Sequence, residues 1–130
     1  MENNLKRPDQ RKVYVVDDDD AVRDSLRALL EASGFDVRDY GSAEEFLSHR
    51  SADAKACLLL DLHMPVISGI DLLEHMRSHG PQLPTIMFSG RSDPSLKERA
   101  LRGGALELMD KPVAEDSLLK AIGRAFASAD

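Results

Sequence analysis

Charged or hydroxyl side chains follow four separate, mainly apolar runs of this chain, each at the point where the run ends. Asp61 comes directly after the run Cys57-Leu58-Leu59-Leu60 and stands just before a proline-containing segment. The other residues with this placement are Asp17 and Asp18 after residues 13–16, Ser89 after residues 85–88, and Lys111 after residues 106–110. If the runs are strands of one sheet, these side chains form a polar site for a divalent cation and a phosphoryl group.

The residue types suit that chemistry. Mg²⁺ (magnesium) prefers oxygen ligands, and a cation among Asp17, Asp18 and Asp61 could neutralise charge during phosphoryl transfer. A carboxylate can itself accept the phosphoryl group, while Lys111 offers a compact positive charge and Ser89 a hydroxyl donor. Each residue alone has an ordinary explanation: Ser89 as a local cap, Lys111 as a solvent-exposed lysine, and Asp17 and Asp18 as part of an acidic turn. Their shared placement favours the functional interpretation.

Strands and helices are expected to alternate along the whole chain. Apolar runs and helical spacing predict strands over residues 13–16, 36–40, 56–60, 85–88 and 106–109, and helices over residues 20–32, 42–49, 69–78, 94–102 and 115–127. Such βα units imply a parallel sheet with helices on both faces, and the first, third and fourth strands should be central. In such sheets ligands bind beyond the carboxyl ends of the strands, where all the polar residues singled out above fall.

Turn and capping residues set the expected helix boundaries. Ser42 and Glu45 have the spacing of a capping box at the start of the second helix. Gly34, Gly80-Pro81 and Gly103-Gly104 are expected to end the first, third and fourth helices.

Composition bounds the class of protein. The chain has 130 residues, 42% hydrophobic and 31% charged, which predicts one globular domain over residues 12–130 after a polar, disordered leader of residues 1–11. A net charge of −6 without a basic stripe disfavours direct nucleic-acid binding. No apolar run approaches the roughly 20 residues of a membrane span. The single cysteine, Cys57, is expected to be a buried thiol, which fits a reducing cytoplasm.

Several motifs together resemble the receiver domain of bacterial two-component response regulators. They are Val15-Val16-Asp17-Asp18-Asp19, Leu60-Asp61-Leu62-His63-Met64-Pro65, Gly69, Ser89-Gly90 and Lys111-Pro112. The resemblance covers residue 12 to about residue 127 and is closest to the FixJ-type branch. It implies an α/β fold of the flavodoxin-like, doubly wound (βα)5 kind, with a five-stranded parallel sheet in the order 2-1-3-4-5.

The resemblance also implies a role for each residue near the third strand. Asp61 would accept a phosphoryl group from a histidine of a sensor kinase. Asp18 and Asp61 would bind Mg²⁺ directly, Asp17 would help through water, and His63 would contribute its backbone carbonyl. The chain would then be a phosphoacceptor that promotes its own phosphorylation and dephosphorylation, and not an enzyme acting on other substrates.

Further residues complete the implied site. Ser89 would contact the phosphoryl group and Lys111 would pair with it. The bond from Lys111 to Pro112 is cis in the family, which would aim the lysine inward. Pro65 would stiffen the turn after the third strand, and Gly69 would supply backbone geometry that other residues resist.

Leu108 departs from the family pattern. Many members carry Phe or Tyr at this position, and the ring turns inward as the hydroxyl residue moves toward the phosphate. Leucine has no ring to turn, so we expect a weaker coupling from Ser89 to the last strand and its flanking helices.

The expected partners are proteins. They are a sensor histidine kinase, a downstream target or missing output domain, and a second copy of the chain through the fourth helix, fifth strand and fifth helix. The sequence ends about where the last helix ends, so we expect either a stand-alone receiver or one excised from a longer regulator.

Two alternatives stay open at this point. A phosphatase of the haloacid-dehalogenase type would use Asp17 as its nucleophile, but it would leave Asp61 and Pro65 without a role. A degenerate receiver would act as an interaction module without phosphotransfer. The presence of all the site residues argues against this module, and Leu108 argues mildly for it.

Overall fold

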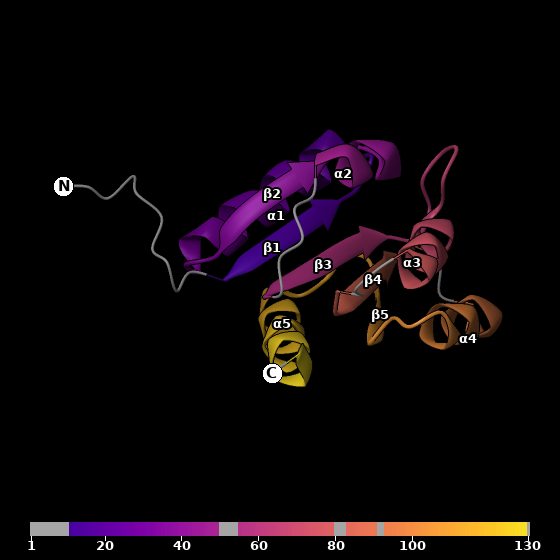
Figure 1. Cartoon of the computed structure of the whole chain (residues 1–130). Coiled ribbons are helices and arrows are strands. Elements are labelled where there is room, and N and C mark those ends of the chain that lie inside the picture. Colours follow the sequence, from indigo (N-terminus) through magenta and orange to yellow (C-terminus); the bar gives the residue numbers. More distant parts are fainter. Residues whose placement is uncertain (1–10, 50–54, 80–82, 91–92, 130) are drawn as a thin grey trace.

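The structure, a computed structural model, describes residues 11–49, 55–79, 83–90 and 93–129. Strands and helices alternate throughout this part of the chain (Figure 1). The strands are β1 (Lys12–Val16), β2 (Asp36–Tyr40), β3 (Ala56–Asp61), β4 (Thr85–Ser89) and β5 (Glu107–Asp110). The helices are α1 (Asp20–Ala32), α2 (Ala43–His49), α3 (Gly69–Ser78), α4 (Pro94–Arg102) and α5 (Glu115–Ala129).

The strands form one parallel sheet in the order β2-β1-β3-β4-β5. This confirms the predicted fold class and strand order, and β1, β3 and β4 are the three interior strands, as their apolar runs indicated. Every residue of β3 and β4 is buried, whereas the edge strands β2 and β5 carry exposed positions. An apolar run is needed where helices cover both faces of a strand.

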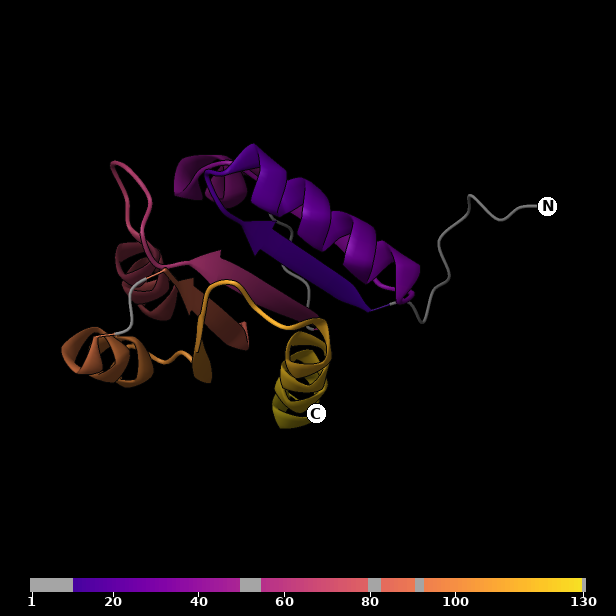
Figure 2. The same ribbon diagram turned by 180° about the vertical axis from the view of Figure 1, so that it is seen from behind.

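Two hydrophobic cores lie on opposite faces of the sheet. Side chains alternate between the faces of a strand, so Leu58 and Leu60 pack with α2, α3 and α4, and Cys57 and Leu59 pack with α1 and α5. Figure 2 shows α1 and α5 on the face turned away in Figure 1. Burial raises the pKa of the Cys57 thiol to about 12, which confirms a buried thiol. No helix in the described part of the chain has the length and apolar character needed to span a bilayer.

The strands extend slightly further than the side-chain pattern predicted. Asp61 and Ser89 are the last residues of β3 and β4, and do not follow them. The ladder of backbone hydrogen bonds continues past the apolar residues, since Leu62 N donates to the carbonyl oxygen of Phe88 at 2.8 Å. The predicted bounds of α1, β2, α3 and α4 are confirmed.

Two boundary predictions fall partly outside the described residues. The expected break at Gly80-Pro81 lies there, and so do residues 1–10 of the predicted leader. Arg11, the last residue of that leader, accepts a backbone hydrogen bond from Asp36 N at 2.9 Å. Its guanidinium lies 4.7 Å from the centre of the Phe126 ring.

Capping side chains fix the starts of α2 and α3. Ser42 Oγ accepts a hydrogen bond from Glu45 N at 3.1 Å, as predicted, but the Glu45 carboxylate accepts from Gly41 N, one residue before the cap. A complete capping box, which was not predicted from the sequence, joins Ser68 and Asp71 at α3. It satisfies two backbone N–H groups at the start of α3.

The loop from β3 to α3 depends on a close backbone approach at Gly69. A Cβ atom there would lie 2.4 Å from the carbonyl oxygen of Asp61 and 2.9 Å from Leu62 Cα. Gly69 is therefore required by space, and the positive φ angle in this loop belongs to Val66, at 69°. Ile67 N donates to the Pro65 carbonyl across Val66 at 2.8 Å, which makes a tight three-residue turn.

Substitution of Gly69 by alanine should destabilise the fold strongly. Because the new methyl group would meet backbone atoms that cannot move independently, we expect a loss of about 3 kcal/mol in the free energy of unfolding, measured by urea denaturation. Gly123→Ala is the matched control: a Cβ at this helical position meets no heavy atom within 4 Å. It should stabilise the protein by about 0.5–1 kcal/mol. Equal stabilities of the two variants would contradict a steric requirement for glycine at position 69.

Candidate functional site

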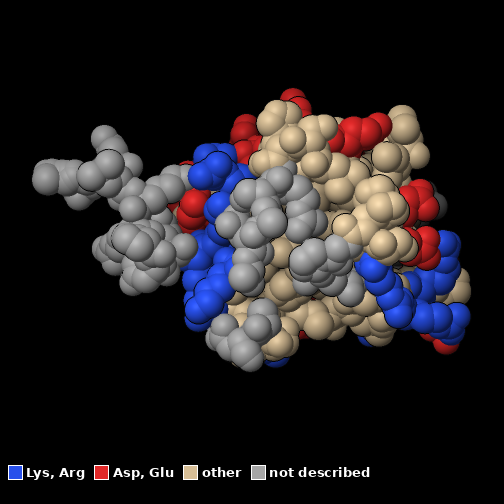
Figure 3. All heavy atoms as spheres, viewed as in Figure 1, with Lys and Arg blue, Asp and Glu red and all other residues tan. Residues whose placement is uncertain are grey.

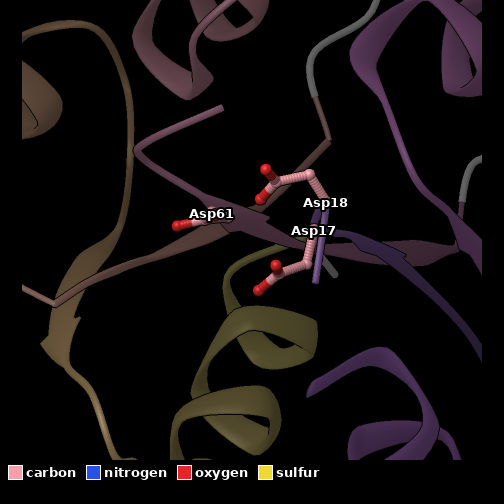
Figure 4. A group of neighbouring side chains, drawn as sticks. All are labelled: Asp17, Asp18 and Asp61. Carbon is pink, nitrogen blue, oxygen red and sulfur yellow. The ribbon is translucent and has the colours of Figure 1, made fainter. Parts of the chain in front are cut away.

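The ends of three strands bring Asp17, Asp18, Asp61 and Lys111 together. One oxygen from each of the three carboxylates lies within 4.8 Å of the others. Figure 4 shows the three side chains pointing to the same side of the strand ends. Lys111 Nζ lies 3.0 Å from Asp17 Oδ2 and 3.3 Å from Asp61 Oδ1. Residues far apart in the sequence thus form one charged cluster.

Asp17 is buried and held from several directions. Asp19 N donates to its Oδ1 atom at 2.9 Å, and its own backbone N–H donates to the Tyr40 carbonyl at 3.2 Å. Asp18, by contrast, is exposed. One carboxylate of the pair is therefore fixed within the protein, and the other is open to an incoming cation.

Asp61 has 5% of its surface exposed, at the centre of the cluster. Burial raises the pKa of its carboxyl, and the charge of Asp17 raises it further. Two groups lower the pKa: the nearby Lys111 charge, and the backbone N–H of His63, which donates to Asp61 Oδ1 at 3.3 Å. They do not outweigh the first two effects. The positive charge near the ionised Asp61 therefore does not compensate for its burial and for the charge of Asp17.

Lys111 directly follows β5 and is hydrogen-bonded to the end of β4. Its backbone N–H donates to the Ser89 carbonyl at 2.8 Å, and the bond from Lys111 to Pro112 is cis. Burial lowers the pKa of the ammonium group, but hydrogen bonds to Asp17 and Asp61 and their charges raise it by more. The net shift is upward, so Lys111 remains protonated at neutral pH.

Ser89 and His63 form a contact that was not predicted from the sequence. Ser89 is fully buried at the end of β4, and its Oγ atom lies 3.3 Å from His63 Nε2. Asp61, His63, Gly90 and Lys111 line an open hollow beside them. The sequence contained a signal for His63, which stands two residues after Asp61. Side chains two residues apart in an extended segment project to the same side, so His63 could have been expected near the site.

Leu108 lies one layer below this site. It is paired with Met87 across β4 and β5, and it packs, partly buried, against the core under α2, α3 and α4. Leu108 is therefore directly adjacent to β4, the buried strand that ends in Ser89.

The donor set fits a hard divalent cation. All three groups near one another in the described cluster are carboxylates, and an oxygen-only set suits Mg²⁺ better than metals that prefer nitrogen or sulfur. The crowding of negative charge at Asp61 points the same way, because a cation would relieve it.

Comparison with known proteins agrees with this geometry. A family model described as response regulator receiver domain matches residues 13–123. The response regulator protein TodT of Pseudomonas putida is 37% identical over 114 residues, covering 88% of this chain and 50% of that protein. The transcriptional regulatory protein FixJ of Azorhizobium caulinodans is 36% identical over 115 residues, covering 88% and 54%. The crystal structure of FixJ-N superposes with a TM-score of 0.84 at 33% identity, covering 91% of this chain and 94% of that one.

These findings confirm the predicted resemblance to FixJ-type receivers and favour it over the phosphatase alternative. The chain spans about half the length of the curated relatives it matches. The strand order of the sheet and the carboxylates at its strand ends agree with the matched family model. The chain belongs to the response regulator receiver domain family.

Proposed function

We propose that this chain accepts a phosphoryl group on Asp61 from a phosphohistidine of a sensor kinase. One observation carries the proposal: a nearly buried carboxylate at the end of a central strand has a lysine ammonium at 3.3 Å and two further carboxylates close by. In the transfer, an Asp61 oxygen forms a bond to phosphorus as the phosphorus–nitrogen bond to the imidazole breaks. Attack of water on phosphorus later releases inorganic phosphate and restores the carboxylate.

The neighbouring residues have separate tasks in this proposal. Asp18 and Asp61 would hold Mg²⁺ directly, Asp17 through water, and His63 through its backbone carbonyl. When bound, the cation supplies positive charge to the phosphoryl oxygens. Asp17 is suited to an indirect role because its two carboxylate oxygens already accept hydrogen bonds from Asp19 N and Lys111.

Lys111 and Ser89 would bind the phosphoryl oxygens. Lys111 lies beside Asp61 and can exchange a carboxylate contact for a phosphate contact with little movement. Ser89 Oγ can donate to a second oxygen once it leaves the imidazole of His63. These contacts exist only in the phosphorylated state, so they can shift the balance between two conformations.

We further propose that the phosphorylated chain acts in the cytoplasm on a protein partner or output domain. The surface formed by α4, β5 and α5 is the proposed contact, also for a homodimer. Figure 3 shows basic side chains gathered over α4, where Lys97, Arg99 and Arg102 are exposed, and the exposed apolar Leu101 and Leu106 lie in the same region. A surface of this composition suits an acidic partner with an apolar centre.

Phosphorylation tests the assignment of Asp61. Incubation with a phosphorylated kinase, or with acetyl phosphate and Mg²⁺, should give a labile adduct on the wild type and none on Asp61→Asn. Asp24→Asn, on an exposed face of α1, is the control and should label normally. Mass spectrometry that found the phosphoryl group on Asp17 would support the phosphatase alternative. No adduct from any donor would favour the interaction module.

The stability of Asp61→Asn tests the charge crowding. A raised folded pKa means that the ionised carboxylate destabilises the fold above that pKa. With a chelator present, Asp61→Asn should therefore unfold at higher urea concentration than wild type at pH 7. The difference should shrink as pH falls through the folded pKa and vanish below the unfolded value of about 3.9. A destabilised variant at pH 7 would contradict the crowding of charge at Asp61, and Asp24→Asn should change stability by less than about 0.5 kcal/mol.

Leu108 predicts a muted conformational response. Amide chemical shifts of α4 and β5 should change little when beryllofluoride, a stable stand-in for the phosphoryl group, binds in the presence of Mg²⁺. Leu108→Tyr provides the comparison, because it restores an aromatic ring at this position, and its shifts should be larger. Large changes across residues 94–109 in the wild type would be incompatible with the prediction.

A further inference from the structure

A single arginine of α1 is bound to the backbone of the acidic loop. Arg23 Nη1 donates to the carbonyl oxygen of Asp17 at 2.7 Å, and its Nε donates to Asp39 Oδ2 at 3.2 Å. Its Nη2 atom pairs with Asp20 at the start of α1. The side chain is 17% exposed, so most of its surface is covered by the protein. One planar group thereby joins the acidic loop, α1 and the end of β2.

The carbonyl that Arg23 binds belongs to the peptide joining Asp17 to Asp18. A peptide unit is planar, so the direction of its carbonyl fixes the direction in which the next residue leaves. The side chain of Asp17 is already held by Asp19 N and Lys111. Rotation of this peptide would redirect the exposed Asp18 carboxylate, and the hydrogen bond from Arg23 opposes that rotation.

The surroundings of Arg23 hold its guanidinium in place. Arg27, one turn later in α1, pairs with the other carboxylate oxygen of Asp39, so Asp39 is fixed from two sides. Gly41 leaves room for the guanidinium, since a Cβ there would lie only 3.2 Å from Arg23 Nη1. Arg23 is therefore held by Asp39 of β2 as well as by its contacts to Asp17 and Asp20.

Electrostatics alone would give Arg23 the opposite effect on cation binding. A permanent positive charge near the carboxylates repels an incoming cation, and its removal should then strengthen binding. The backbone contact works in the other direction, because a loosened loop loses the alignment of its ligands. The two effects differ in sign, which makes them separable by experiment.

We infer that Arg23 is a positioning residue for the divalent-cation site: it holds the Asp17–Asp18 peptide so that both carboxylates face Asp61. The inference rests on the proposed cation site and goes beyond it by naming a group that never touches the cation. It also links the end of β2, through Asp39, to the chemistry at β3.

The test is a Mg²⁺ titration of the unphosphorylated chain in which amide chemical shifts report binding. Arg23→Met should raise the dissociation constant roughly tenfold, the size of effect seen when a residue supporting metal ligands is lost. Arg27→Met is the matched control, because it removes an equal charge and an Asp39 contact but no contact to Asp17. Since Arg27 supports Arg23 only through Asp39, this variant should leave the dissociation constant closer to the wild-type value than Arg23→Met does.

Equal or tighter binding by Arg23→Met relative to Arg27→Met would overturn the inference. If Arg23→Met does not fold, as judged by its amide spectrum, Arg23→Lys decides. Lysine keeps the charge but cannot bind three groups with one planar fork, so weaker binding than wild type is expected and unchanged binding refutes the proposal. Absence of Mg²⁺ binding by the wild type would instead remove the cation site itself, and the inference with it.

Discussion

The ammonium group of Lys111, placed between Asp17 and Asp61, is the interaction on which the site depends. Two buried carboxylates on neighbouring strands repel each other, and the loss of their shared partner would leave buried charges uncompensated at a cost of several kcal/mol. Yet one lysine cannot balance three carboxylates, and the pKa of Asp61 stays raised. The folded protein therefore keeps a deficit of positive charge at Asp61, which a bound cation would reduce.

Much of this arrangement could be predicted from the sequence because β1, β3 and β4 are covered on both faces. Such strands need uninterrupted apolar residues, so their ends are marked by the first charged or hydroxyl side chain. Parallel pairing then brings Asp17, Asp61 and Ser89 to one edge of the sheet. The pattern placed Asp61 and Ser89 just after their strands, because side-chain polarity gives no information on how far the backbone ladder continues.

The contacts that escaped prediction depend on packing between elements. In the sequence, Arg23 is one of several charged residues of an amphipathic helix. Its hydrogen bond to the Asp17 carbonyl forms only because α1 lies against the sheet. The contact between His63 and Ser89 joins the loop after β3 to the end of β4. Gly69 was predicted to matter through its backbone angles, whereas a close approach of two backbone segments excludes any larger residue.

The alternation of β3 between two cores has a consequence for how such a domain can diverge. Leu58 and Leu60 serve one core, and Cys57 and Leu59 serve the other. A one-residue insertion within this strand would exchange the two sets and turn Asp61 toward the opposite face. Strand length is thus nearly immutable by small genetic steps. New signalling partners must arise through helix surfaces and loops, which can change while the strand ends stay in register.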